Sequence, residues 1–427
     1  MDSLDIIAAC VSAVIILWSA FHAAFALYFR FAFARRQSSI TESCETDDPK
    51  VSVILSLRGH DPFLEQTLEC LLNQSYGDFE IIVVVDSDTD PAWAIVQSAK
   101  LRHDRLDRMR IYALQNPRPT CSLKCSALVQ AIDYLSDDRE VVVLIDADVV
   151  PHQHWLSDVA SPLSNQEIGV VTGNQWFEPA QVTIGSTMRS LWNAGALVVT
   201  AIHANPWAGT CAMRRSDLID SGLIDAWKTS VVDDGPIKQA FQKLGKRVQF
   251  EPSLIMVNRD GCDVAFVNRY ITRMLTWSRV YESSFIGTAM HAIAAALIAS
   301  SVLAVLVASL IDADPVAMSI SIAALTASNL IMFAAYTVVR QTVARAVLER
   351  GCTLTDEESQ QSWPLICLLI PLVQMAHVFW TLRAVFVRSV KWRQITYRLE
   401  GRGRVKMLQY VPLSTENPDP LQQNLSV

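Results

Sequence analysis

The sequence predicts two kinds of structure in one chain: an α/β domain with a mostly parallel sheet, and α-helical transmembrane segments. Two observations carry this prediction. Short runs of β-branched residues alternate with helical stretches from about residue 50 to residue 260, which is typical of a parallel sheet with helices on both faces. Long apolar stretches flank that region, and hydrophobic residues make up 51% of the 427 residues, more than an ordinary soluble domain carries.

The first apolar stretch, residues 6–29, has no acidic or basic side chain except His22 and is long enough to span a bilayer. A cleaved signal peptide is the alternative, but the chain begins with MDSLD instead of basic residues, and no small-residue cleavage site follows. Basic residues follow the stretch directly: Arg30, Arg35 and Arg36. Because basic residues stay on the cytoplasmic side, we expect a transmembrane anchor over residues 1–36, with the chain entering the cytoplasm after it.

A polar linker is expected at residues 37–49, followed by a cytoplasmic α/β domain over residues 50–268. The expected strands are 51–57, 79–86, 109–114, 141–148 and 168–174, and the expected helices include 61–74, 91–103 and 122–136. Ligands of such sheets bind outside the carboxyl ends of the strands. The residues that follow each strand are therefore the candidates for a functional site.

Two apolar stretches separated only by IDADP predict a transmembrane hairpin over residues 285–339, followed by a cytoplasmic segment at 340–362. The next apolar stretch, 363–388, contains Pro371 and polar side chains. It either spans the membrane or forms a broken, re-entrant helix at the interface. Residues 389–427 read as a basic segment and a disordered tail. A full fourth span would export the basic residues, so we expect the broken helix and a cytoplasmic C-terminus.

Charge and cysteine content exclude two classes of function. The net charge is −7, so the basic footprint of a nucleic-acid-binding protein is absent. The nine cysteines include no CxxC pair, which argues against a zinc site and fits unpaired thiols on a reducing, cytoplasmic face.

Acidic residues occur at three informative places. Asp86 ends one expected strand, and Asp146 and Asp148 end another, where strand alternation would point both side chains the same way. Asp233 and Asp234 come just before an expected helix. Each residue alone has an alternative role as a turn former or helix cap. Together they favour sugar transfer from a nucleotide diphosphate, which needs a hard divalent cation for the leaving group and a carboxylate that accepts a hydroxyl proton.

The chain resembles the family 2-type GT-A glycosyltransferases, and within them the family 21-like membrane enzymes related to ceramide glucosyltransferase. The resemblance covers about residues 50–400 and implies a GT-A, Rossmann-like fold. It rests on VSVILSLRGHDPFLEQTLECLLNQSYGDFEIIVVVDSDTDPA from residue 51, WAGTCAMRRSDL (207–218), DDGPIKQAFQKLG (233–245), RMLTW (273–277) and KWRQITYRL (391–399).

The resemblance implies roles for individual residues. Asp86 matches the aspartate that helps to seat the uracil of UDP, and Lys124 falls where the family places a basic residue near the nucleotide. Asp146 and Asp148 match the D-x-D pair, with Asp148 as the direct metal ligand. Asp234 matches the catalytic base.

The family's R-x-x-R-W signature implies that Arg273 and Trp277 belong to the UDP-sugar site. Thr276 stands in place of its second arginine. Arg269 shares a helical face with Arg273, and Arg279 follows, so we expect one of these two to compensate. An interfacial helix over residues 269–284 that binds lipid headgroups is the alternative interpretation.

These implications predict a multi-pass integral membrane enzyme with a cytoplasmic catalytic domain. It would be an inverting hexosyltransferase that moves a hexose, with glucose favoured, from a UDP-sugar to the hydroxyl of a membrane lipid such as ceramide, with Mn²⁺ or Mg²⁺ as cofactor. One alternative is a processive polysaccharide synthase, a class that carries more spanning helices and a Q-x-x-R-W motif. Another is a non-catalytic membrane scaffold, against which the presence of Asp148 and Asp234 argues.

Overall fold

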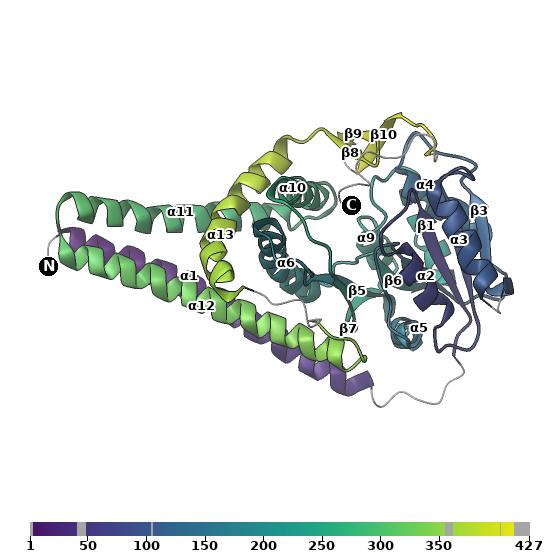
Figure 1. Cartoon of the computed structure of the whole chain (residues 1–427), viewed down its shortest axis with the longest axis horizontal. Coiled ribbons are helices and arrows are strands. Elements are labelled where there is room, and N and C mark those ends of the chain that lie inside the picture. Colours follow the sequence, from purple (N-terminus) through teal and green to yellow (C-terminus); the bar gives the residue numbers. More distant parts are fainter. Residues whose placement is uncertain (1–2, 41–47, 104–105, 355–361, 402, 414–427) are drawn as a thin grey trace.

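The structure is a computed structural model that describes residues 3–40, 48–103, 106–354, 362–401 and 403–413. An α/β domain lies at one end, and long apolar helices project from it as a stalk (Figure 1). The predicted class, a mostly parallel α/β sheet combined with apolar helices, is confirmed.

The α/β domain is built on a seven-stranded sheet with the order β3-β2-β1-β4-β6-β5-β7. The strands are β1 (Val51–Leu57), β2 (Phe79–Val85), β3 (Met109–Ala113), β4 (Val141–Ile145), β5 (Ile168–Phe177), β6 (Thr210–Arg214) and β7 (Arg247–Asn258). Strands β1 to β4 pair in parallel, and β6 runs antiparallel to both β4 and β5. All five expected strands are present, whereas β6 and β7 were not predicted.

Strand β4 ends at Ile145, earlier than expected, so Asp146 and Asp148 lie in the turn that follows it. The prediction that strand alternation aligns these two carboxylates is therefore wrong. The turn itself sets their directions.

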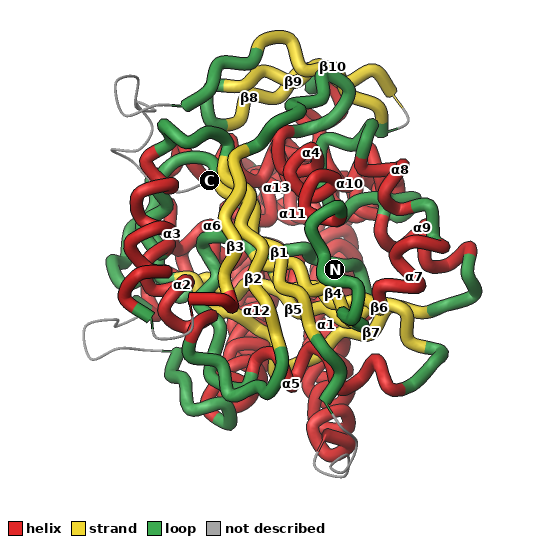
Figure 2. The backbone as a smooth tube through the Cα atoms, turned by 90° about the vertical axis from the view of Figure 1, so that its right-hand side faces the viewer, coloured by secondary structure: helices red, strands yellow, loops and turns green. Residues whose placement is uncertain are grey.

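Helices cover both faces of the sheet (Figure 2). They are α2 (Leu64–Leu72), α3 (Pro91–Arg102), α4 (Leu123–Ile132), α5 (Trp155–Ala160), α6 (Ile184–His203), α7 (Arg215–Asp220), α8 (Leu223–Trp227) and α9 (Ile237–Lys243). Alternate residues of β1 face opposite layers: Val53 and Leu55 pack in the apolar cluster with α2 and α3, and Ile54 packs in the cluster with α4 and α9. This two-sided burial explains the continuous apolar runs in the parallel strands.

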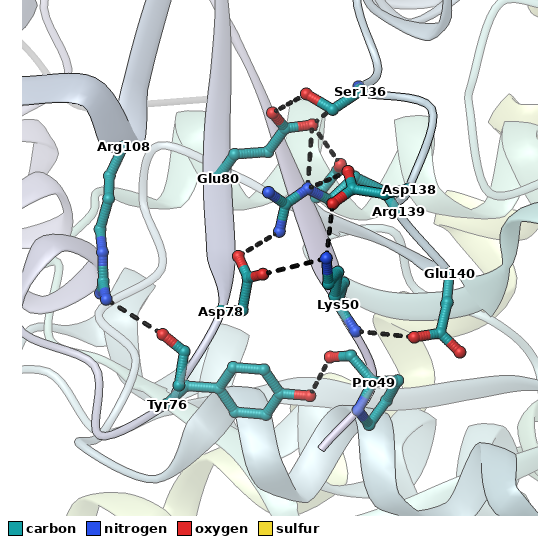
Figure 3. Close-up of polar contacts among 12 residues, drawn as sticks. Pro49, Lys50, Tyr76, Asp78, Glu80, Arg108, Ser136, Asp138, Arg139 and Glu140 are labelled. Atoms are coloured by element: carbon teal, nitrogen blue, oxygen red, sulfur yellow. Dashed lines mark hydrogen bonds and ion pairs between the residues drawn. The ribbon is translucent and has the colours of Figure 1, made fainter. Parts of the chain in front are cut away.

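The amino end of the sheet is held by a network of matched charges (Figure 3). Lys50 Nζ lies 2.7 Å from Asp138 Oδ2. Glu80, on β2, accepts hydrogen bonds from the hydroxyls of Ser52 at 2.6 Å and Ser136 at 2.7 Å. Burial acts to raise the pKa of Glu80, but these hydrogen bonds and the charge of Arg110 outweigh it and lower that pKa.

The stalk is formed by α1 (Ser3–Ile40), α11 (Phe285–Ile311) and α12 (Pro315–Leu348) (Figure 1). These three helices and α13 (Trp363–Phe386) are the helices among the described residues that are long and apolar enough to cross a membrane. Helix α1 extends into the expected linker at 37–49, of which residues 41–47 lie outside the described part of the chain.

Helix α13 runs through Pro371 without interruption, so the broken helix expected here is wrong. Figure 1 shows α13 running steeply from α12 past α11 towards β8 and β9. It packs on α6 and on α10 (Val264–Tyr281). Helix α10 corresponds to the helix expected over residues 269–284, but it begins five residues earlier and ends three residues earlier.

The basic segment after α13 folds as a three-stranded antiparallel sheet of β8 (Ser389–Trp392), β9 (Ile395–Gly401) and β10 (Arg404–Gln409). It packs against the α/β domain, where Ile395 and Tyr397 join the apolar cluster under α4. Leu413, in the expected disordered tail, is buried against the domain. Residues 414–427 lie outside the described part. Because β8–β10 contact the α/β domain, both lie on the same side of any membrane that the stalk crosses.

Candidate active site

Lys124 joins two of the acidic loops at the carboxyl end of the sheet. It lies in the first turn of α4, which Ser122 caps by accepting a hydrogen bond from Cys125 N at 3.1 Å. The Lys124 ammonium pairs with Asp146, in the turn after β4, and lies 2.7 Å from Asp233 Oδ2, in the loop before α9. Asp233 is therefore an ion-pair partner and not the helix cap considered from the sequence.

Asp148 and Asp234 carry strongly perturbed carboxyl groups. Burial raises the pKa of Asp148 well above its usual range, and the charges of Asp146 and Asp61 raise it further. Burial and the neighbouring charge of Asp233 do the same to the pKa of Asp234. Like charges that share a desolvated site favour protonation unless a cation compensates them. The arrangement is therefore suited to bind positive charge, and perturbed carboxyl groups of this kind are typical of active sites.

Asp86 is buried at the end of β2 and is held by residues that the sequence reasoning missed. Arg58, which directly follows β1, pairs with its carboxylate. From the C-terminal segment, Tyr410 Oη donates to Asp86 Oδ1 at 3.2 Å and the Leu413 amide donates to Oδ2 at 3.0 Å. The rule that singled out Asp86, its place just after a parallel strand, applies equally to Arg58. No sequence signal pointed to Tyr410.

Arg393 reaches the same region from the turn between β8 and β9. Arg393 and Gln394 have φ of 40° and 69°, the left-handed values that a two-residue hairpin turn requires. The guanidinium of Arg393 lies 3.3 Å from Asp61 Oδ2, and its carbonyl accepts a hydrogen bond from Arg58 Nε at 3.2 Å. Arg273, on α10, lies close enough to Asp148 and Arg393 for both charges to act on its pKa, which burial lowers.

The other residues of the RMLTW segment, and the two arginines that flank it, do not contact the carboxylates. Thr276 is fully buried and donates to the Thr272 carbonyl at 2.7 Å. Arg279 donates to two backbone carbonyls at the end of α13, at 2.8 and 2.7 Å, and Arg269 is exposed. The guanidinium of Arg279 is therefore engaged on the helix end, away from the carboxylates, and the expected compensation by Arg269 or Arg279 stays a prediction. Trp277 packs, partly buried, against the apolar cluster under α4 and α9.

Tyr281, at the end of α10, positions the loop that carries Asp233 and Asp234. Its hydroxyl lies 2.7 Å from Ser230 Oγ. A Cβ at Gly235 would lie 2.4 Å from Cγ of the Tyr281 ring, so only glycine lets the ring approach the loop this closely.

The Asp146–Asp148 pair can supply part of a metal coordination shell. Within the described ranges, no group of three or more His, Cys, Asp or Glu side chains is placed to hold a metal ion. Two carboxylates suit Mg²⁺ or Mn²⁺, which accept oxygen ligands and retain waters or phosphate oxygens in their other positions.

Comparison with known proteins adds the family. Among solved structures, a mannosyltransferase from Pyrobaculum calidifontis in complex with GDP-Man and Mn²⁺ covers 88% of this chain and 96% of its own, at 17% identity and a TM-score of 0.45. Glucosyl-3-phosphoglycerate synthase from Mycobacterium tuberculosis, in complex with Mn²⁺ and UDP-glucose, covers 55% of this chain and 81% of its own, at 18% identity and a TM-score of 0.36. The model of glycosyl transferase family 21 matches residues 8–405. The predicted resemblance is confirmed, and the chain is a glycosyltransferase that belongs to glycosyl transferase family 21.

Proposed function

We propose that this glycosyltransferase moves a hexose, with glucose favoured, from a UDP-sugar to the hydroxyl of a membrane lipid such as ceramide. The observation that carries the proposal is the placement of Asp86, Asp148 and Asp234 in three separate loops at one end of the sheet, in a domain attached to apolar helices. The first two match a nucleotide diphosphate with its cation, and the third matches a hydroxyl that must lose a proton.

The donor would bind along the carboxyl ends of β2 and β4. Asp86, oriented by Arg58, would accept a hydrogen bond from the nucleobase. Asp148, with Asp146, would hold the divalent cation, and that cation would stabilise negative charge on the departing diphosphate. Lys124, already paired with Asp146, would keep the donor side of the site electrically balanced.

Arg393 is the residue that we propose in place of the missing signature arginine. It stands near Arg273 and Asp61, both of which lie close to Asp148, on the side where a diphosphate would meet the cation. Arginine matches phosphate oxygens through paired N–H donors. Trp277 would support the site through packing, since its contacts are with the apolar cluster.

Asp234 would take the proton from the acceptor hydroxyl as the oxygen attacks the anomeric carbon. The attack runs in line with the departing UDP, so the configuration at that carbon inverts. The raised pKa of Asp234 favours this role, because a base is most effective when its pKa is near the working pH.

The catalytic domain would face the cytoplasm. Arg30 and Arg35 follow the apolar part of α1, and Arg340 and Arg345 lie near the end of α12, at the ends of both helices that adjoin the domain. A Val411→Cys variant tests this orientation, in a background without Cys44 and without Cys10 and Cys352, which are the exposed thiols among the described residues. An impermeant maleimide should label it only after the cells are permeabilised, and labelling of intact cells would place the domain outside.

The function is tested with membranes that contain the protein, a panel of UDP-sugars, and mass spectrometry of the lipids that form. A single added hexose on a lipid alcohol, absent with Asp234→Asn, is the expected result. A long sugar polymer would instead indicate a processive synthase. A failure to release UDP from every donor would indicate a non-catalytic scaffold.

A further inference from the structure

The apolar stalk contains a cluster of polar rings that the proposed chemistry does not use. His22 of α1 and His291 of α11 face each other with their Nε2 atoms 2.8 Å apart. Trp18 stacks on His291 with 5.0 Å between ring centroids. His377 of α13 lies 6.3 Å from His291 by ring centroids and accepts a hydrogen bond from Trp192 Nε1 at 3.3 Å.

The cluster lies where the stalk meets the α/β domain. Further out along the stalk, Ile15 of α1 packs on α11 and α12. On the other side of His22, Ala26 and Phe29 pack in the apolar cluster that includes β7 of the domain. His291 lies six residues after the start of α11, about 9 Å along the helix. Figure 1 shows this end of α11 beside α10 and α13.

Holding helices together accounts for only part of the hydrogen-bonding capacity of these histidines, through His22 with His291 and His377 with Trp192. Polar residues in membrane-spanning helices are costly and are typical of functional sites. Helices α1 and α12 already share a hydrogen bond between the hydroxyls of Ser19 and Ser328, at 2.7 Å. Among the described residues, His291 Nδ1 and His377 Nε2 have no hydrogen-bond partner, and all three histidines are partly exposed. Unpartnered imidazole nitrogens at the junction of apolar helices and a catalytic domain are available to the polar groups of a lipid ligand.

An apolar pocket adjoins the cluster on α1. It is shallow and open, with a volume of about 340 Å³, and its lining residues all lie on the surface of α1: Val14, Leu17, Trp18 and Phe21. Trp18 belongs to both features, because it lines the pocket and stacks on His291. A ligand that spans them would have a hydrocarbon part and, beside it, groups that form hydrogen bonds.

A row of aromatic side chains connects the cluster to the acidic site. The ring of Trp192 lies 6.3 Å from that of Tyr270 on α10, at an interplanar angle of 87°. The guanidinium of Arg273 lies 5.9 Å from the centroid of the Tyr270 ring. Arg273 is in turn close to Asp148. The cluster is therefore joined to the proposed catalytic centre through packed side chains and is not an isolated feature of the stalk.

We propose that His22, His291 and His377, with the apolar pocket beside them, form the binding site for the acceptor lipid of the proposed function. The pocket would hold the first part of a hydrocarbon chain. His291 Nδ1 and His377 Nε2 would bind the uncharged amide and hydroxyl groups next to it, and His22, whose Nδ1 contacts the Trp18 carbonyl at 2.8 Å, would orient His291. A neutral imidazole donates from one nitrogen and accepts at the other, which matches an amide or a hydroxyl. The cluster contains no cationic side chain that would select a phosphate or carboxylate headgroup.

The test uses the full-length protein in phosphatidylcholine nanodiscs, with UDP-glucose and a short-chain ceramide as probes. His377→Phe keeps a ring but removes both nitrogens. We expect it to raise the KM for the ceramide roughly fivefold, the effect of one lost hydrogen bond, and to leave the KM for UDP-glucose unchanged. His377→Gln should recover part of the loss. The matched control is Ser328→Ala, which removes a hydrogen bond elsewhere in the stalk and should change neither constant. An unchanged ceramide KM in His377→Phe and in His291→Phe would overturn the proposal.

A direct measurement keeps this result separate from the proposed function. A ceramide with a photoreactive diazirine beside its amide should label peptides of α1, α11 or α13 in the wild-type protein, and less so in the histidine variants. Labelling confined to other helices would refute the site. If wild-type protein transfers sugar to no lipid, the proposed function fails, and the labelling pattern still decides whether the cluster binds this lipid.

Discussion

The two ends of the central sheet both collect acidic residues, but their surroundings differ. At the amino end the acidic residues are paired with bases, and the members are Lys50, Asp78, Glu80, Arg110, Asp138 and Arg139. At the carboxyl end carboxylates outnumber cations, and the members are Arg58, Asp61, Asp86, Lys124, Asp146, Asp148, Asp233, Asp234, Arg273 and Arg393. Local hydrogen bonds lower the pKa of Glu80 at the first end, and burial raises the pKa of Asp148 and Asp234 at the second.

This difference distinguishes residues that stabilise the fold from residues whose charge a bound ligand would compensate. A carboxylate in a desolvated site stays charged only when a base or a set of hydrogen-bond donors compensates it. The amino end contains its own compensation, so its charges add to stability without needing anything from outside. The carboxyl end lacks part of that compensation, which a bound cation would supply. An excess of carboxylates over cations, and not the presence of carboxylates alone, therefore identifies the candidate site.

The largest effect should come from removing divalent cations. We expect EDTA to abolish sugar transfer and Mn²⁺ or Mg²⁺ to restore it. Asp148→Asn should lose activity more completely than Asp146→Asn, because Asp146 is already paired with Lys124. Asp78→Asn, at the amino end, is the control and should keep its activity. Full turnover in EDTA would show that the excess carboxylates have another purpose.

The next effect concerns the proposed base. Asp234→Asn keeps the shape of the side chain but cannot accept a proton, so turnover should fall about 10²-fold or more. UDP binding, measured by calorimetry, should stay close to that of the wild type. Asp225→Asn changes an exposed aspartate of α8 that pairs only with Lys228 among the described residues, and should have no such effect. Turnover of Asp234→Asn near the wild-type value would remove Asp234 from this role.

A smaller effect is expected at Arg393. Its removal would cost one charge-assisted contact with the diphosphate, so Arg393→Ala should raise the KM for the UDP-sugar about tenfold. Arg398→Ala is matched to it, because Arg398 lies on the same small sheet but is paired with Glu400 at 3.0 Å. Equal donor KM values for both variants would show that Arg393 only supports the turn.

The smallest effect should appear at the amino end, in stability and not in catalysis. Glu80→Gln weakens its bonds to Ser136 and Arg110, which should cost about 1–2 kcal/mol in unfolding free energy at pH 7. Because the pKa of Glu80 is lowered in the folded protein, this cost should shrink as the pH falls through that pKa. Thermal unfolding at pH 7 and in acid measures it. A loss of turnover per folded molecule would contradict the division between the two ends.

Several features of the protein follow from sequence patterns alone. The β-branched runs that become β1 and β2 are apolar on both faces, and the stretches that become α1 and α11 exceed the thickness of a bilayer. Both signals depend on neighbouring residues, so they can be read without knowing the fold. The position of Asp86 just after a strand, and of Asp234 just before a helix, could be predicted for the same reason.

Tertiary structure decided what completes the site. Arg393 meets Asp61 and Tyr410 meets Asp86 because a small C-terminal sheet folds back onto the domain, and no local pattern encodes contacts between residues so distant in sequence. The same holds for Thr276, whose place in a familiar motif suggested the diphosphate, but whose burial in α10 turns it away. Secondary-structure propensity and the spacing of apolar residues depend only on residues a few positions apart. Packing between helices and strands decides which side chains share a desolvated site. Burial and like charge in that site then set their pKa and their chemistry.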